Sequence, residues 1–180
     1  GLKFFDGSAW SFAKAGSEEL LGMSCDIVIG ADVMVTAVAG KTYVSTSGAA
    51  GFELKSGSED DGLLPDGSFG SIKFAISSSN TNYIYASYVT TAGALHNIYL
   101  STDKGNTWRV VYPGGSSLGD IFSGQGLRNN AIAVDPTNEK TVYLGAYDVY
   151  KGYEAQPTGY YSWSQITNGF DNPYPSMGTS

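Results

Sequence analysis

The chain is poor in the residues that build metal, redox and nucleic-acid sites. Its 180 residues include one cysteine, Cys25, one histidine, His96, and ten basic residues against seventeen acidic ones. A single cysteine excludes an internal disulfide, and no second histidine or cysteine stands at zinc-ligand spacing from His96. The net charge of −7 disfavours nucleic acid and anionic membranes as partners. No apolar run approaches the length needed to span or insert into a membrane.

These scarce residues have ordinary structural interpretations. We expect Cys25 to be a small apolar strand residue, and His96 to face solvent or to accept a hydrogen bond. The segment "SEDDG" (58–62) clusters carboxylates but lacks the spacing of a calcium-binding loop, which favours a solvated acidic loop. The sequence therefore predicts neither a metal nor a cofactor.

Glycine and aromatic residues are abundant, and they recur in a pattern. The chain has 24 glycines and 13 tyrosines but only 15% charged residues, which favours short strands and tight turns. An aromatic residue, a glycine-bearing turn, a second aromatic residue and a short strand recur in segments starting at Lys41, Asn97 and Asp148. Trp108 follows Phe52 by 56 residues, and Trp163 follows Trp108 by 55. A partial copy, "KFFDGSAWSFAKAG", lies near Gly1.

A second pair of strand-like runs precedes each hairpin, so each unit is expected to form four short antiparallel strands. A sheet of that size cannot bury its faces alone, whereas similar sheets stacked around an axis can. The sequence therefore predicts an all-β fold, a β-propeller with loops at 56–70 and 113–129. We expect residues 1–16 to be the end of one blade, and 22–57, 70–113 and 129–169 to be three blades. Residues 170–180 are expected to start the next blade or to form a tail.

Three blades and the outer end of a fourth fall short of the four to eight blades typical of a propeller. We expect the rest of a longer chain, or an oligomer, to complete the ring; a closed propeller of 180 residues is the less favoured alternative. The chain starts with Gly1 and carries no targeting segment, which favours a processed or trimmed chain or a piece of something longer.

The segment "STDKGNTW" (101–108) resembles the Asp-box, or bacterial neuraminidase repeat, whose pattern is Ser-x-Asp-x-Gly-x-Thr-Trp. The copy at Ser45 keeps the serine, loses the aspartate and has Phe52 in place of tryptophan, whereas the third copy shares only Trp163. The run "AIAVDPTNEKTVYLG" resembles the segment before the box in propellers of the xyloglucanase and sortilin-like kind. The resemblance implies a propeller; it does not imply one function, since sialidases, hydrolases, sorting receptors and adhesins share the box.

Each fixed residue of the box has an expected structural role. Asp103 is expected to accept hydrogen bonds from its own turn, and Gly105 to supply a backbone conformation that other residues resist. Thr107 and Trp108 are expected to begin the outer strand, with Trp108 packed over the turn, and Ser101 is the first fixed position. The box lies on the blade rim in the families that it resembles, so Asp103 is not a catalytic candidate.

Catalytic residues are hard to assign. The Asp-box that the segment resembles occurs in sialidases, and these enzymes bind the substrate carboxylate with three arginines. This chain has only Arg109 and Arg128, which excludes a complete sialidase. A xyloglucanase-like inverting enzyme needs two carboxylates about 6.5–9.5 Å apart, and such enzymes carry an aspartate followed by two glycines. Asp148 and Asp120 are the nearest candidates, and neither precedes a Gly-Gly pair.

The aromatic residues of the last blade favour binding instead. Sugar rings stack on exposed aromatic faces, and we expect Tyr153 and Tyr160, on a predicted loop, to be the ligand-binding candidates. The sequence therefore favours an extracellular, cell-surface or virion-surface propeller that binds a glycan or a surface protein as an adhesin. A fragment of a secreted glycoside hydrolase, xyloglucanase-like before sialidase-like, is the first alternative, and a structural or assembly propeller is the second.

Overall fold

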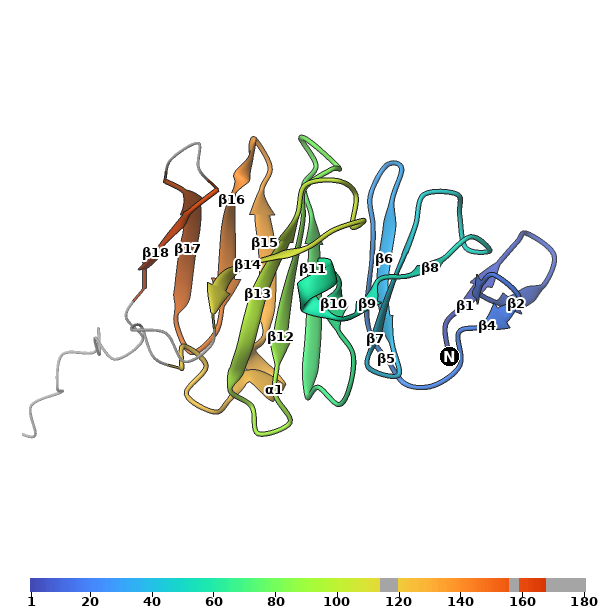
Figure 1. The fold of residues 1–180 in the computed structure, drawn as a ribbon, viewed down its shortest axis with the longest axis horizontal. Helices are drawn as coiled ribbons and strands as arrows, with labels where there is room; N and C mark the ends of the chain where they lie inside the picture. Colours follow the sequence, from blue (N-terminus) through green and yellow to red (C-terminus); the bar gives the residue numbers. More distant parts are fainter. Residues whose placement is uncertain (114–119, 156–158, 168–180) are drawn as a thin grey trace, which may run out of the picture.

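The computed structural model describes residues 1–113, 120–155 and 159–167. Three four-stranded antiparallel sheets follow one another along the chain and stand side by side (Figure 1). Blade 1 consists of β5 (Ser24–Ile29), β6 (Met34–Val38), β7 (Lys41–Ser45) and β8 (Glu53–Leu54). Blade 2 consists of β11 (Ser71–Ile76), β12 (Ile84–Val89), β13 (Leu95–Ser101) and β14 (Arg109–Pro113). Blade 3 consists of β15 (Ala131–Asp135), β16 (Asn138–Gly145), β17 (Val149–Glu154) and β18 (Tyr161–Gln165).

The strand order of every blade follows the chain, and the first strands of the three blades lie next to one another. Apolar side chains fill the two spaces between the blades. Val35, Phe74 and Tyr88 belong to the core between blades 1 and 2, and Leu100 and Val142 to the core between blades 2 and 3. Blade 2 is covered on both faces, which explains why every residue of β12 is buried although side chains alternate between faces.

Hydrogen bonds between buried hydroxyl groups join the blades in addition to the apolar cores. Thr42 Oγ1 and Tyr88 OH lie 2.5 Å apart between blades 1 and 2, and Tyr85 OH and Tyr161 OH lie 2.5 Å apart between blades 2 and 3. The indole N–H of Trp163 donates to the carbonyl of Val111 at 3.0 Å. These bonds satisfy polar groups that would otherwise be buried without partners.

Residues before blade 1 form two small antiparallel sheets. β1 (Lys3–Phe5) pairs with β2 (Trp10–Phe12), and β3 (Lys14–Ala15) pairs with β4 (Glu18–Glu19). Ala13 and Leu20 form a third apolar cluster with Val38 and Phe52 of blade 1. This segment therefore covers the outer part of blade 1.

The connection between blades 1 and 2 is more regular than the plain loop that the sequence predicted. It contains a short parallel pair, β9 (Ser56–Gly57) with β10 (Leu64–Pro65), and a 3-10 helix, η1 (Glu59–Asp61). The Ser58 hydroxyl accepts a hydrogen bond from the Asp60 N–H at 3.2 Å and caps η1. A short helix, α1 (Gly126–Asn129), lies between blades 2 and 3. The predicted tail, 170–180, lies outside the described residues.

The two ends of the sheets carry different turns, and we name each end by one residue. The Asp103 rim carries the turns between the third and fourth strands, which are 46–52, 102–108 and the connection from β17 to β18. The Asp148 rim, at the opposite end, carries the turns between the second and third strands, which are 39–40, 90–94 and 146–148. Because neighbouring strands of these blades are antiparallel, the turns between third and fourth strands and the turns between second and third strands lie at opposite ends of the sheets.

Candidate functional site

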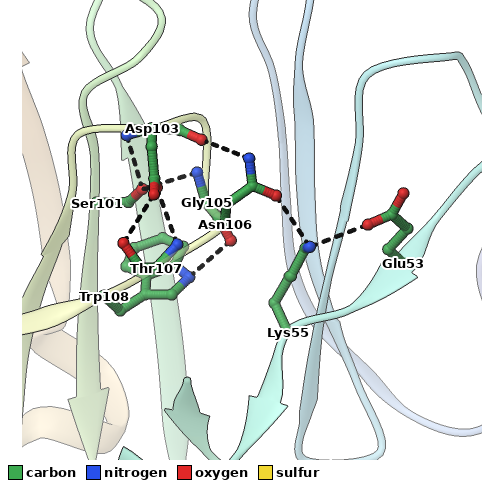
Figure 2. Close-up of polar contacts among 8 residues, drawn as sticks. All are labelled: Glu53, Lys55, Ser101, Asp103, Gly105, Asn106, Thr107 and Trp108. Atoms are coloured by element: carbon green, nitrogen blue, oxygen red, sulfur yellow. Dashed lines mark hydrogen bonds and ion pairs between the residues drawn. The ribbon is translucent and has the colours of Figure 1, made fainter. Parts of the chain in front are cut away.

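The Asp103 turn (101–108) is held by hydrogen bonds that begin and end within it (Figure 2). One carboxylate oxygen of Asp103 accepts from the Ser101 hydroxyl at 2.7 Å and from the Thr107 N–H at 2.9 Å. The other accepts from the Thr107 hydroxyl at 2.7 Å. The Ser101 Oγ in turn accepts from the Gly105 N–H at 2.7 Å, and the Trp108 indole donates to the Gly105 carbonyl at 3.0 Å. The expected hydrogen bonds of Asp103 are therefore present.

The turn differs from the prediction at its end. The outer strand β14 begins at Arg109, so Thr107 and Trp108 precede it instead of opening it. Their polar groups explain this, because the Thr107 N–H binds Asp103 and the Trp108 N–H donates to the Gly62 carbonyl at 2.8 Å. Neither N–H group is left to pair with β13.

The Asp103 turn also connects blade 2 to blade 1. Lys55 of blade 1 donates to the Asn106 side chain at 3.0 Å and to Glu53 at 2.9 Å (Figure 2). Lys104 pairs with Asp32 of blade 1 at 2.5 Å. A side chain at Gly105 would place its Cβ 2.8 Å from a methyl group of Val44. The turn is thus packed against the neighbouring blade, and Asp103 is not among the residues that line the hollow at Tyr153 or the hollow at Ile29.

Acid should remove the contribution of Asp103 to stability. Burial by itself would raise the pKa of this carboxyl, but hydrogen bonds from Thr107 and Ser101 outweigh it and hold the pKa below its ordinary value of 3.8. A carboxyl with a lower pKa in the folded state stabilises above the unfolded pKa and loses that contribution as the pH falls through the folded pKa. We expect Asp103→Asn to lower the free energy of unfolding by about 1–3 kcal/mol at neutral pH.

Urea denaturation at a series of pH values measures this effect. The difference between the unmodified protein and Asp103→Asn should narrow as the pH falls below about 4, because both then carry a neutral side chain at position 103. Asp66→Asn is the matched control, since Asp66 is an exposed loop residue. A difference that stays constant from neutral pH to acid would contradict the assignment.

The two weak catalytic candidates lie on the Asp148 rim, and both have structural partners. One oxygen of Asp120 accepts from the N–H groups of Leu95 at 3.2 Å and Phe122 at 3.1 Å, and the other from Gly124 at 2.8 Å. These bonds hold the loop before α1 against the start of β13. These three backbone hydrogen bonds make Asp120 an anchor of this loop.

Asp148 joins the turn between β16 and β17 to the residues that follow β18. Its carboxylate accepts from the Gln165 amide at 2.9 Å and from the Thr167 hydroxyl at 3.3 Å. The Thr167 hydroxyl also accepts from the Val149 N–H at 2.8 Å. These contacts give Asp148 a role in shaping the rim, and they do not place it beside Asp120.

The two predicted ligand-binding tyrosines lie towards the opposite rim, but Tyr153 belongs to strand β17 and not to a loop as predicted, whereas Tyr160 lies in the connection from β17 to β18. Both side chains are exposed. Tyr153 contributes to an open hollow of about 350 Å³ at the ends of β16 and β17 nearest the Asp103 rim, lined by Asn138, Lys140, Thr141, Lys151, Tyr153 and Glu154. Lys140 pairs with Glu154 at 2.8 Å, and this hydrogen bond raises the pKa of Lys140, which therefore stays charged. Tyr160 is not part of this lining.

His96, which was predicted to face solvent or to form a hydrogen bond, is half-buried. Its Nε2 atom is buried and has no hydrogen-bond partner within the described residues. The reason is a bulge in the pairing of β12 with β13, where Tyr88 pairs with Asn97 and Val89 with Leu95, so that His96 is the extra residue. The bulge places its ring near Phe69, at a centroid distance of 5.3 Å.

Sequence reasoning missed the partner of Arg109. Its guanidinium donates to the Gly159 carbonyl at 2.6 Å and lies over the ring of Tyr161, which ties blade 2 to the long turn of blade 3. No group of three or more His, Cys, Asp or Glu side chains in the described residues, including 58–62, is placed to hold a metal ion. In the same residues, no helix is long and apolar enough to cross a membrane. The Cys25 side chain lies outside the described part of the chain.

Comparison with known proteins supports the fold. The chain resembles the GH74 enzyme of Niastella koreensis with a TM-score of 0.58 and 16% identity, over 87% of this chain and 25% of that enzyme. It resembles an ancestral GH74 enzyme with a TM-score of 0.57 and 19% identity, over 92% of this chain and 21% of that enzyme. No family model and no curated protein matches the sequence. The predicted fold class, part of a β-propeller with four-stranded antiparallel blades, is therefore confirmed, and the chain spans a quarter or less of these enzymes.

Proposed function

We propose that these blades belong to a secreted β-propeller glycoside hydrolase. The observation that carries the proposal is the likeness of nearly the whole chain to two GH74 enzymes. The sequence favoured a binding propeller and held the hydrolase as its alternative, and the comparisons support that alternative better. The substrate that we propose is xyloglucan or a related plant β-glucan, as the resemblance to xyloglucanase-type propellers implies. A polymer of this kind is too large to cross a membrane, so the enzyme would act outside the cell.

In this proposal the described blades form the scaffold and part of the substrate-facing surface, and other blades supply the acid and the base. Inverting hydrolysis needs a carboxylic acid and a carboxylate on opposite sides of the scissile bond. Asp120 and Asp148 are both engaged in hydrogen bonds that hold loops. We therefore assign the proton transfers to residues beyond these three blades.

A second candidate function is glycan binding, and the hollow beside Tyr153 favours it. An aromatic side chain there adjoins Asn138 and two lysines, and these groups match the apolar faces and hydroxyl groups of a sugar ring. Such a site would serve an adhesin, or a hydrolase that holds its polymer away from the site of cleavage.

The proposal is tested by incubating xyloglucan with the protein translated from the complete gene. The measurement is the release of reducing sugar ends. We expect hydrolysis, and we expect Asp120→Asn and Asp148→Asn to lower kcat by less than about tenfold, because loss of a proton-transferring group costs about 10²–10⁴-fold. Tyr153→Ala should leave kcat unchanged and weaken retention on immobilised glycan if the second function holds. No hydrolysis of any β-glucan, with binding that depends on Tyr153, would overturn the hydrolase in favour of the adhesin.

A further inference from the structure

We propose that β1 and β2 are the outer half of a further blade, and that two inner strands of the same polypeptide dock on β1 and on blade 1. These strands would cover the face of blade 1 that carries Ile27 and Ile29. In all three complete blades the strand order follows the chain. The docking strands would therefore be the two that immediately precede β1. The inference rests on the fold and not on the proposed activity.

The pairing of β1 with β2 repeats the pairing of β7 with β8. Lys3 pairs with Phe12 as Tyr43 pairs with Leu54. The next hydrogen bonds repeat as well. The Ala13 N–H donates to the Leu2 carbonyl at 3.0 Å and the Leu20 N–H to Ala13 at 2.8 Å. In blade 1 the Lys55 N–H donates to Thr42 at 2.8 Å, and the Leu64 N–H to Lys55 at 3.0 Å.

This correspondence makes β1 a third strand that lacks a second. In blades 1, 2 and 3 the third strand pairs on its other edge with the second strand, as β7 does with β6. Among the described residues β1 pairs with β2 alone. A strand edge of this kind presents backbone N–H and C=O groups that accept another strand.

The apolar cover of blade 1 ends where the missing strands would lie. Val28 belongs to the core between blades 1 and 2, so Ile27 and Ile29, its neighbours along β5, point to the opposite face. They are 41% and 68% exposed. By strand pairing they correspond to Phe74 and Ile76 of β11, which pack into the core between blades 1 and 2. The outer part of the same face is covered by the cluster that contains Ala13 and Leu20.

The shape of this face fits an apolar strand. A hollow of about 240 Å³ lies at its edge, lined by Ile29, Gly30, Ala31, Asp32, Val33, Met34, Ser45, Thr46 and Gly48. Burying Ile27 and Ile29 would remove exposed apolar surface from water, which favours docking. The strands that fill the gap should alternate apolar residues toward Ile27 and Ile29 with polar or small residues on the other face, as half-buried strands do.

Thiol labelling of the protein translated from its complete gene tests the docking. In a Cys25→Ser background, Ile29→Cys is compared with Val110→Cys, since Val110 is 40% exposed on the outer strand of a blade with neighbours on both sides. Without docked strands, the thiol at position 29 would react faster than the thiol at position 110, because Ile29 is 68% exposed and Val110 is 40% exposed. We expect the reverse, with Ile29→Cys at least about tenfold slower, because docked strands open rarely.

Equal or faster reaction at position 29 would overturn the proposal, and so would slow reaction that becomes fast on dilution, since that points to a second copy of the chain. As a control, the Ile29→Cys and Val110→Cys thiols should react with the label at equal rates in denaturant, which shows that both thiols are intact. Hydrogen exchange of the unmodified protein is the second measurement, in which the peptide that spans β1 should be as protected as the one that spans β7. Neither readout depends on hydrolysis, so failure here and failure of the proposed function are distinguishable.

Discussion

Replacing Trp108 with alanine is expected to lower the free energy of unfolding by about 3–5 kcal/mol, the usual cost of removing a buried aromatic side chain. The indole is buried in the core between blades 1 and 2, in the same apolar cluster as Val44, Phe74 and Tyr99. It also donates to the Gly105 carbonyl at 3.0 Å, so truncation removes both apolar packing and the hydrogen bond that closes the turn. A loss of this size is a large part of the stability of an ordinary domain.

Urea denaturation measures the loss, and two variants identify its source. Trp10→Ala removes the same side chain from an exposed position and should change the free energy of unfolding by less than about 0.5 kcal/mol. Trp108→Phe keeps most of the burial and loses the indole N–H, so it should cost only about 1–2 kcal/mol. If Trp108→Ala proves no worse than Trp10→Ala, the packing of blades 1 and 2 described here is wrong.

The contacts inside the Asp103 turn could be predicted from the sequence, and the contacts that it makes with blade 1 could not. Ser101, Asp103 and Thr107 are close along the chain, so a short pattern of residues determines their hydrogen bonds. Lys55 and Asp32 lie far away in the sequence and meet the turn only because blades 1 and 2 stack. Repeat spacing predicted that the blades stack, but it held no information on which side chains face each other.

The same limit explains the catalytic candidates. The aspartates Asp120 and Asp148 had no distinguishing partner in the sequence, because the role of a carboxylate depends on the groups that fold around it. For Asp120 these are backbone N–H groups, which no sequence pattern marks. Tyr153 and Tyr160 were equivalent as loop aromatics, and the pairing of β17 with β16 is what brings Tyr153 alone to the hollow.

A repeated feature of the Asp148 rim escaped sequence reasoning, although its signal was present. Gly40 and Gly93 each occupy the turn between the second and third strands of a blade, with φ angles of +76° and +88°. A Cβ at Gly40 would lie 1.9 Å from the Gly67 carbonyl oxygen, and a Cβ at Gly93 would lie 2.2 Å from that of Gly124. Glycines at matching places in two blades are the signal that marks this feature in the sequence.

Gly40→Ala should therefore be among the most destabilising single-methyl changes in the chain. A left-handed backbone costs an alanine about 1–2 kcal/mol, and the contact with the Gly67 carbonyl forces the turn and the following loop apart. We expect a total loss of about 3–5 kcal/mol, measured as a lower urea midpoint with an unchanged slope. Gly93→Ala should behave alike, because its Cβ meets the Gly124 carbonyl in the same way.

Gly48→Ala separates the two causes. Gly48 lies in the same blade with a φ of +91°, but a Cβ there would have no atom within 4 Å. Its loss should stay near about 1–2 kcal/mol, which is the backbone cost alone. If Gly40→Ala and Gly48→Ala lose equal stability, the close approach of the two backbones is absent in solution. If Gly40→Ala loses more, the excess measures how rigidly the Asp148 rim holds the loop between blades 1 and 2 against blade 1.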